Sequence, residues 1–266
     1  MPLISVIMGV YNCKRYDLLY NSVQSIMNQT VEDWELLICN DGSVDDTLDK
    51  LYEVAKLDHR IKILSYKENK GLAYALNYCI EHAQGQYLAR QDDDDISYPA
   101  RFEKQISFLK EHPEYAIVGT NADVYDDDGI WGEYKVTEKP DKNSFLWNSP
   151  FAHPTVMVKK DAIMVSGQYR VAKETRRCED YDLFMKMYSI GYKGYNIQEK
   201  LYKYRIVNNN DKYRAMKYRF DEAVVRWRGY KSLKILLPKG IFFVIKPIAI
   251  VLIPQKVFKL IRKNVY

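Results

Sequence analysis

The residues of this sequence best suited to chemistry are four consecutive carboxylates, Asp92 to Asp95. Adjacent negative charges repel one another, so we expect a cation to lie beside them when the protein works. Carboxylate oxygens are preferred ligands of hard divalent ions, which makes Mg²⁺ or Mn²⁺ the natural candidate. A solvated acidic loop is the alternative. The apolar stretch Tyr87–Ala89 before the run favours instead a strand end, where α/β sheets bind ligands.

Strand and helix patterns alternate in the segments that precede this run. Apolar, β-branched stretches predict buried parallel strands at 4–10, 34–39 and 61–64. Helices are predicted at 16–28, from about residue 47, and at 72–83. Such alternation is typical of βαβ units, so the sequence predicts an α/β fold with a parallel sheet.

After the acidic run the predicted elements continue with a different pattern. Strands are predicted at 116–120, 130–136, 153–158 and 201–205, and helices at 99–111 and 179–190. The second acidic run, Asp126–Asp128 before Gly129, is interpreted as a hairpin turn rather than a second metal site. Glu179 and Asp180 open a predicted helix, where the helix dipole favours acidic residues for purely structural reasons.

Several familiar binding motifs are missing from the sequence. A calcium loop starting at Asp92 would need an oxygen ligand and then glycine where the chain has Ile96 and Ser97. There is no GxGxxG after the first strand and no GxxxxGK[ST], which excludes dinucleotide-binding and P-loop proteins by motif. The cysteines are scattered and predict reduced, mostly buried thiols of a cytosolic protein: Cys13, Cys39, Cys79 and Cys178.

Positive charge is concentrated at the C-terminal end of the chain. The net charge of +5 divides into 24 Lys+Arg against 32 Asp+Glu in residues 1–200, and 16 against 3 in residues 201–266. A basic helix is predicted at about 211–230, followed by an apolar, proline-interrupted tail at 235–262. The longest apolar stretch, 240–253, is shorter than the roughly 20 residues that a spanning helix needs.

We therefore expect residues 235–263 to lie on an anionic membrane surface, with lysines reaching the headgroups. A C-terminal helix packed on the body of the protein is the alternative. A nucleic-acid partner is not expected, because the basic residues of the tail alternate with large aliphatic ones.

Six segments, taken in order, carry a resemblance to a known family: SVIMGVYN, ELLICNDGSVDDT, ENKGLAYALN, GQYLARQDDDDIS, AHPTVMV and EDYDLF. Over about residues 3–205 the chain resembles the family 2 glycosyltransferases, inverting enzymes of the GT-A fold. It is most similar to bacterial enzymes that build capsule, cell-wall or lipopolysaccharide repeat units on lipid carriers. The resemblance implies a Rossmann-like, mostly parallel sheet flanked by helices.

The resemblance also implies a division of the chain. Residues 1–210 would form the glycosyltransferase domain, with a nucleotide-binding half at about 1–122 and an acceptor-binding half at about 123–210. Residues 211–266, beyond the resemblance, are expected from their charge and apolar pattern to form the basic amphipathic helical tail. With this tail we expect the protein to be cytoplasmic and peripheral on the inner face of the cell membrane.

Site residues follow from the matching positions. By resemblance, Tyr11 and Asn12 line the nucleobase pocket, Asp41 accepts a hydrogen bond from the base, and Asn69 and Lys70 close the nucleotide side. The donor implied is a nucleotide-sugar, with a UDP-sugar favoured, and the acceptor is a saccharide or lipid-linked saccharide.

The acidic run stands where the family has its DxD motif. Asp92 is assigned to the ribose and metal side, and Asp94 to direct coordination of Mn²⁺ or Mg²⁺. Four consecutive aspartates leave the register open by one residue, so Asp93 is a rival for either role, and Asp95 is expected to be structural.

The second half supplies the remaining roles. Glu179 and Asp180 match the family's acidic pair near the acceptor, with Asp180 as the catalytic base. His153 belongs to a recurring HP segment near the donor diphosphate or sugar. The QxxRW motif of the family's processive synthases is missing, which favours transfer of a single sugar.

The chemistry itself requires these parts. A metal would stabilise the leaving nucleoside diphosphate, and a carboxylate must take the proton of the attacking hydroxyl. One base and no covalent nucleophile predict direct displacement with inversion. Two alternatives stay open at this point. A sugar nucleotidyltransferase would need a glycine-rich basic loop where the chain has GVYNCKRY. A non-catalytic, membrane-associated protein could keep the fold without turnover.

Overall fold

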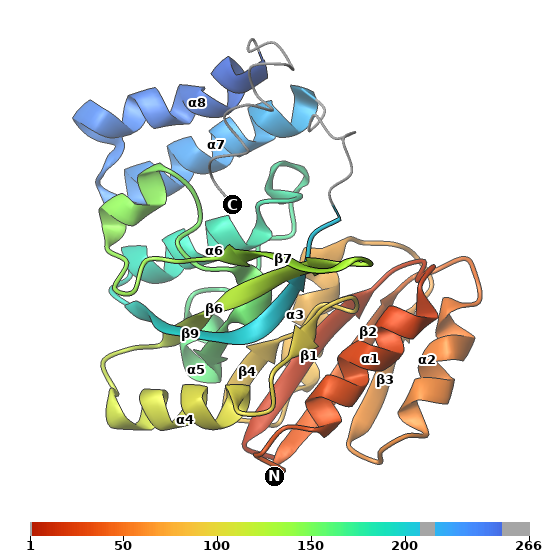
Figure 1. Ribbon diagram of the computed structural model, residues 1–266. Helices are drawn as coiled ribbons and strands as arrows, with labels where there is room; N and C mark the ends of the chain where they lie inside the picture. The colour runs from red at the N-terminus through yellow and green to blue at the C-terminus, as the bar shows by residue number, and fades with distance from the viewer. Residues whose placement is uncertain (1, 208–215, 252–266) are drawn as a thin grey trace.

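Two hydrophobic cores, one on each face of a single sheet, organise the residues that this computed structural model describes, 2–207 and 216–251. The sheet has nine strands in the order β3-β2-β1-β4-β8-β6-β9-β5, with β7 paired to β6 outside this path. Figure 1 shows helices on both of its faces. The α/β fold predicted from the sequence is thereby confirmed.

The N-terminal part is a parallel βαβ array. Its strands are β1 (Ile4–Val10), β2 (Trp34–Asp41), β3 (Ile61–Tyr66) and β4 (Tyr87–Arg90). Its helices are α1 (Tyr16–Met27), α2 (Thr47–Ala55) and α3 (Leu72–His82). Side chains alternate along a strand, so Val6 and Met8 enter the core under α1 and α2, while Ile7 enters the core that contains α3. All four strands therefore end at the same edge of the sheet.

The C-terminal part completes the sheet with strands of mixed direction. Its elements are β5 (Ile96–Ser97), α4 (Arg101–Glu111), β6 (Ile117–Asp126), β7 (Gly129–Tyr134), β8 (Met157–Lys159), α5 (Lys160–Val165), α6 (Glu179–Ser189) and β9 (Gly194–Arg205). β8 runs antiparallel to both β4 and β6, and β6 pairs with β9 in parallel. The short strand β8 thus joins the two parts into one sheet, and β6 passes through the predicted boundary at 122.

Some predicted elements need correction. The strand predicted at 153–158 is shorter, because His153–Thr155 form a 3₁₀ turn around Pro154, which has no N–H for a sheet. The helix predicted from Pro99 begins at Arg101. Strands β6 and β9 are longer than predicted because they pair with each other along most of their length.

Two smaller predictions are confirmed. Asp126 pairs with Gly129 across the β6–β7 hairpin, so the second acidic run is a turn. The four cysteines are buried and free.

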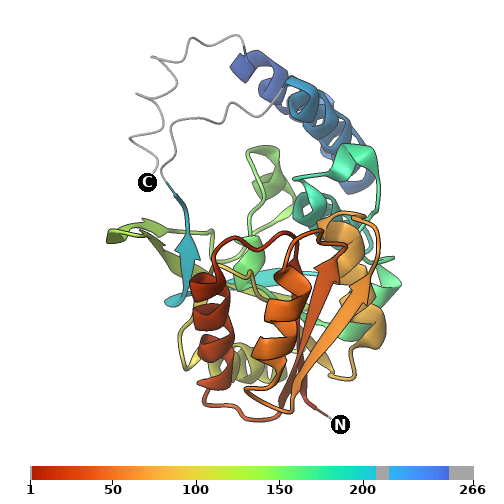
Figure 2. The same cartoon turned by 90° about the vertical axis from the view of Figure 1, so that its right-hand side faces the viewer.

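The C-terminal helices pack on the second half of the molecule. α7 (Met216–Leu233) leads through a π-helical turn at Leu236–Gly240 into α8 (Ile241–Val251). Val225, Tyr230 and Val244 are buried in the same core as α6. Figures 1 and 2 show α7 and α8 as a layer beside α6 and away from α1 and α2. The tail is thus packed on the body as far as Ile248; the part of the predicted tail after residue 251 lies outside the described residues.

In none of the helices within 2–207 and 216–251 is there a stretch both long and apolar enough to traverse a bilayer.

Arg101, at the start of α4, ties the loop after β4 to the rest of the sheet. Its side chain is fully buried, and its guanidinium donates to the Arg90 carbonyl at 2.8 Å, the Ser97 hydroxyl at 2.8 Å and the Gln91 side-chain oxygen at 3.1 Å. It also reaches the Pro154 carbonyl at 3.2 Å, on the segment before β8. One side chain therefore connects the strand end that carries the acidic run to two other segments.

We expect Arg101→Met to lower the free energy of unfolding by about 3 kcal/mol or more, since several buried acceptors lose their donor at a cost of roughly 1–3 kcal/mol each. Urea unfolding followed by circular dichroism measures this change. Lys104→Met on the same helix is the control, because it removes only an exposed contact with Glu199 and should change stability by less than about 0.5 kcal/mol. Equal losses in the two variants would contradict the role given to Arg101.

Candidate active site

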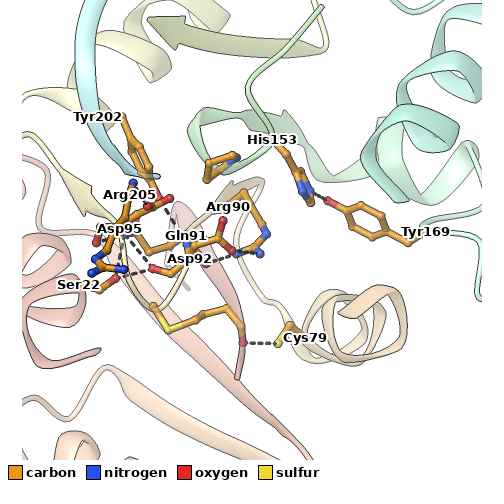
Figure 3. Close-up of polar contacts among 12 residues, drawn as sticks. Ser22, Cys79, Arg90, Gln91, Asp92, Asp95, His153, Tyr169, Tyr202 and Arg205 are labelled. Atoms are coloured by element: carbon orange, nitrogen blue, oxygen red, sulfur yellow. Dashed lines mark hydrogen bonds and ion pairs between the residues drawn. The ribbon is translucent and has the colours of Figure 1, made fainter. Parts of the chain in front are cut away.

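The acidic run lies at the end of β4, where an arginine side chain and a backbone N–H hold two of its four carboxylates. Arg90, whose side chain is 2% exposed, forms an ion pair with Asp92. The backbone N–H of Arg205 donates to Oδ1 of the buried Asp95 at 2.7 Å. Figure 3 shows these residues gathered around the strand end. The Asp92 N–H donates to the Tyr202 hydroxyl there at 3.3 Å.

The two central carboxylates are less well neutralised. Burial, followed by repulsion from Asp94 and Asp92, raises the pKa of Asp93 to about 7. Burial, followed by repulsion from Asp92, raises the pKa of Asp94 to about 6, while Arg205 acts to lower it. Oδ2 of Asp95 is buried and has no hydrogen-bond partner. The loop therefore holds more negative charge than its surroundings balance, which is the condition that favours a bound cation.

The described ranges contain no group of three His, Cys, Asp or Glu side chains arranged to hold a metal ion. Mg²⁺ sites commonly use only one or two carboxylates and take their remaining ligands from water and substrate phosphates. The carboxylate oxygens of Asp92 to Asp94 fit such a site: Asp92 is paired with Arg90, and the pKa values of Asp93 and Asp94 are raised.

The predicted nucleotide-side residues gather at the ends of β1 and β2. Asp41 is 4% exposed. Its Oδ1 accepts hydrogen bonds from the Tyr66 hydroxyl at 2.7 Å and the Lys70 N–H at 2.8 Å. Its Oδ2 accepts from Asn69 Nδ2 at 2.8 Å and the Gly71 N–H at 2.9 Å. Asp41, Asn69 and Lys70 are thus brought together, with Asp41 anchoring the loop; its predicted bond to a base stays a prediction.

Asn12 belongs to the same edge. Its N–H donates to the Ser43 hydroxyl at 2.9 Å, and its Oδ1 accepts the Val44 N–H at 3.1 Å. Tyr11, beside it, is 48% exposed and available to a ligand. Gly42 has φ +63°, and a Cβ there would lie 2.4 Å from the backbone of residue 68, so only glycine lets the two loops approach.

A pocket of about 320 Å³ lies between the two halves of the chain. Among the predicted residues it brings together Asp92, His153 and Asp180. Asp93, Asp94 and Glu179 are not among its lining residues, although Asp93 follows Asp92 in the chain and Glu179 lies between the lining residues Cys178 and Asp180. A carboxylate from the first half and one from the second therefore face one cavity.

Asp180 stands in the first turn of α6. Burial, followed by repulsion from Glu179, raises its pKa to about 6. A carboxyl with this pKa is ionised at neutral pH and is a stronger base than an ordinary aspartate, which suits proton abstraction. The helix dipole favours the ionised form of Asp180, so the rise in its pKa comes from burial and from the charge of Glu179.

His153 lines the same pocket and forms a hydrogen bond through Nε2 with the Tyr169 hydroxyl at 2.8 Å (Figure 3). Burial, followed by the nearby charge of Arg90, holds the pKa of His153 well below its usual value. The imidazole is therefore neutral at pH 7 and can orient a polar group of a ligand without adding charge.

The pocket also has lining residues that the sequence did not reveal, among them Arg90, Tyr134, Ser149, Arg177 and Tyr204. An arginine at the end of an apolar strand could have indicated Arg90, because such a charge needs a partner. The other four come from loops and strands distant in the sequence, and no local pattern marks them.

Comparison with known proteins agrees with this geometry. The sequence model described as "Glycosyl transferase family 2" matches residues 5–167. The chain belongs to this family. It is therefore a glycosyltransferase, and the family predicted from the sequence is confirmed.

Two relatives match this transferase over nearly its whole length. EpsE of Bacillus subtilis, which carries the name of a glycosyltransferase, is 40% identical over 99% of this chain and 94% of its own. An Escherichia coli protein named UDP-Gal:alpha-D-GlcNAc-diphosphoundecaprenol beta-1,3-galactosyltransferase is 30% identical over 99% of this chain and 96% of its own.

Solved structures share the fold. Residues 1–349 of S. aureus TarS in complex with UDP-GlcNAc superpose with a TM-score of 0.68 and 17% identity, over 89% of this chain and 72% of that one. The mannosyltransferase PcManGT of Pyrobaculum calidifontis, in complex with GDP-Man and Mn²⁺, gives a TM-score of 0.63 and 15% identity, over 99% and 80%. The GT-A fold expected from the sequence is confirmed.

A pH profile tests the electrostatics of the acidic pair. With Asp180 as the predicted catalytic base, the transfer rate of this transferase should fall as the pH drops through about 6, because a protonated carboxyl cannot accept a proton. In Glu179→Gln one neighbouring charge is lost, so the pKa of Asp180 falls and the acid limb moves to lower pH. At pH 5 the variant should keep about a threefold larger fraction of its maximal rate.

Glu199→Gln is the control, because this exposed carboxylate pairs with Lys104 on another part of the surface. An acid limb that stays in place in Glu179→Gln would show that Glu179 does not set the pKa of the titrating group.

Proposed function

We propose that this chain is an inverting glycosyltransferase that moves one sugar from a nucleotide-sugar to a hydroxyl of a saccharide acceptor in bacterial surface-polysaccharide synthesis. The observation that carries the proposal is the pocket shared by Asp92, at the end of β4, and Asp180, at the start of α6. Donor-side and acceptor-side carboxylates facing one cavity are what direct displacement at a sugar requires.

Asp180 is the proposed general base. Its pKa of about 6 still leaves most of it ionised at pH 7, while the rise increases its affinity for the proton of the acceptor hydroxyl. The hydroxyl oxygen attacks the anomeric carbon as the bond to the diphosphate breaks, and the proton passes to the Asp180 carboxylate. One displacement inverts the configuration, so an α-linked donor gives a β-glycoside.

Asp94 and Asp92 are the proposed ligands of Mn²⁺ or Mg²⁺, with Asp93 as the rival in the register. When bound, the ion would neutralise negative charge on the leaving diphosphate. Arg90 pairs with Asp92 at the pocket, and neutral His153 adds a polar contact on the same wall.

The proposed donor is a UDP-sugar. TarS, which has the same fold, is described with UDP-GlcNAc, and the Escherichia coli relative is named for a UDP-Gal donor. Tyr11, Asn12, Asp41, Asn69 and Lys70 form the edge on which the nucleotide would lie. The relative's name also describes a diphosphoundecaprenol-linked acceptor, which supports a lipid-linked acceptor here.

An anionic membrane surface is the proposed location, on the cytoplasmic side. Between Ala223 and Val251 the sequence has six Lys or Arg and no Asp or Glu. Leu237 is 75% exposed and Phe242 is 74% exposed. Exposed apolar side chains on a basic helical pair are typical of interfacial binding.

Of the two rival functions, the sugar nucleotidyltransferase loses its basis with the family assignment. A non-catalytic protein with this fold would bind a nucleotide-sugar without transferring the sugar. The following experiment measures both properties.

Wild type, Asp94→Ala and Asp180→Asn are compared by thermal shift with UDP-sugars, each with Mn²⁺ or EDTA, and by transfer to a saccharide acceptor. At 100 times its Kd a donor should stabilise wild type by about 2.7 kcal/mol. Asp94→Ala should lose the metal-dependent stabilisation. Asp180→Asn should keep it while its transfer rate falls by about 10²- to 10⁴-fold.

If Asp180→Asn transfers sugar at a rate close to that of wild type, Asp180 is not the general base. A wild type that binds a nucleotide-sugar but never transfers would favour the non-catalytic protein.

Membrane binding is tested by sedimentation of the full chain with vesicles. We expect binding to vesicles that contain anionic lipid and loss of binding at high salt, since surface charges are screened within about 10 Å at 0.1 M. Leu237→Asp combined with Phe242→Asp should reduce binding by about tenfold or more. Val44→Asp, which places the same charge at an 85% exposed position beside the nucleotide edge, is the control and should bind as wild type does. Unchanged sedimentation of the double variant would contradict the interfacial proposal.

A further inference from the structure

The C-terminal helices contain a buried polar cluster that lies outside the nucleotide edge and the acidic loop. Arg226 of α7 is 1% exposed and forms an ion pair with Glu222 one turn earlier at 2.9 Å. The guanidinium also donates to the Tyr230 hydroxyl at 2.6 Å. Burying this pair is costly unless every donor is satisfied, so its remaining contacts are informative.

Those contacts converge on one loop of the acceptor half. Arg226 donates to the Leu146 carbonyl at 3.0 Å and to the Trp147 carbonyl at 3.1 Å. Lys246 of α8 donates to the same Trp147 carbonyl at 2.7 Å, and its Nζ lies 3.4 Å from the centroid of the Trp147 ring. Two cations from two tail helices thus hold a single carbonyl oxygen.

The loop that they hold forms a wall of the pocket. Asn148 and Ser149, which directly follow Trp147, line the cavity together with Asp180. The Ser149 hydroxyl donates to the Phe151 carbonyl at 3.1 Å, and Ser149 lies on the same cavity wall as Asp180, whose pKa it acts to lower. Arg226 contacts α6 as well, through the Tyr181 hydroxyl at 3.3 Å, next to Asp180 in the chain.

We propose that Arg226 and Lys246 are positioning residues for the acceptor side of the active site: by holding the Trp147 carbonyl they fix Ser149 against Asp180. The proposal rests on the proposed function of Asp180 as the base. It makes α7 and α8 part of the catalytic machinery rather than only a surface for membrane attachment. Neither cation touches the reacting atoms, so each acts through the loop.

Arg226→Gln and Lys246→Met test the proposal in the full-length protein. In Arg226→Gln we expect the transfer kcat to fall by about tenfold or more. Stabilisation by UDP-sugar should be unchanged in both variants, because the nucleotide edge is on other elements. Arg226→Lys keeps the charge and one contact and should recover most of the loss. Arg228→Gln is the matched control: it removes an arginine of the same helix whose ion pair is with Glu174, and it should transfer as wild type does.

A double-mutant comparison separates positioning from general destabilisation. If Arg226 acts through Ser149, then Ser149→Ala should reduce kcat and Arg226→Gln should add little in its presence. Losses that multiply, or a matching loss of donor binding, would overturn the proposal. So would a wild-type kcat in both Arg226→Gln and Lys246→Met.

Hydrogen exchange gives a readout that does not depend on activity. The peptide spanning residues 145–151 should exchange faster in Arg226→Gln and Lys246→Met than in wild type or Arg228→Gln. Lys246 is only partly buried, so Lys246→Met remains informative if Arg226→Gln fails to fold. Unchanged hydrogen exchange of this peptide in Lys246→Met would refute the proposal that Lys246 holds the Trp147 loop. Loss of the proposed function appears differently, as a wild type that binds donor without transferring sugar.

Discussion

Repulsion among four adjacent carboxylates is the constraint on which much of this structure depends. Asp92 to Asp95 are all partly or fully buried at the end of β4, and burial raises the cost of every unbalanced charge. Arg90 balances Asp92 by a direct ion pair, while Arg101 lies beneath the loop and is satisfied by neutral oxygens. Burial, the largest influence, lowers the pKa of Arg101 to about 10, so it stays charged at physiological pH. The remaining imbalance on Asp93 and Asp94 is what makes the loop receptive to a cation.

The mixed order of the sheet follows from the same requirement. The parallel array alone would leave the end of β4 at an edge, open to water. The antiparallel pairing of β8 with β4 instead brings Pro154 and Val156 within reach of Arg101. Strand β9 supplies the Arg205 N–H to Asp95, and the Tyr125 hydroxyl of β6 donates to the Asp94 carbonyl at 2.7 Å. The second half thus provides the donors that the acidic loop lacks, and the pocket forms where the two halves meet.

Local patterns were enough to predict the N-terminal strands and the residues at their ends. Val6, Ile38 and Ala89 are fully buried in strands whose apolar runs can be recognised from the local sequence alone. The position of Asp92 at a strand end follows from these runs. The first and last residues of β6 and β9 could not be predicted from the sequence, because the length of these strands depends on their pairing with each other. Arg226 could not be assigned either. The sequence alone would predict Arg226 to be an exposed charge on a basic helix. Only its contacts with residues about 80 positions away show that it is buried.

Part of the pocket wall lies beyond the segment that the family model matches. The family match ends at residue 167, whereas Asp180, Tyr204 and Glu222 all contribute to the cavity wall. The proposed donor site lies at the strand ends of the parallel array, inside the matched segment. Acceptor recognition needs a surface that differs between enzymes. In the proposed function, loop 145–149 and the helices that brace it would form the acceptor side, apart from the ends of β1 to β4 where the donor would bind.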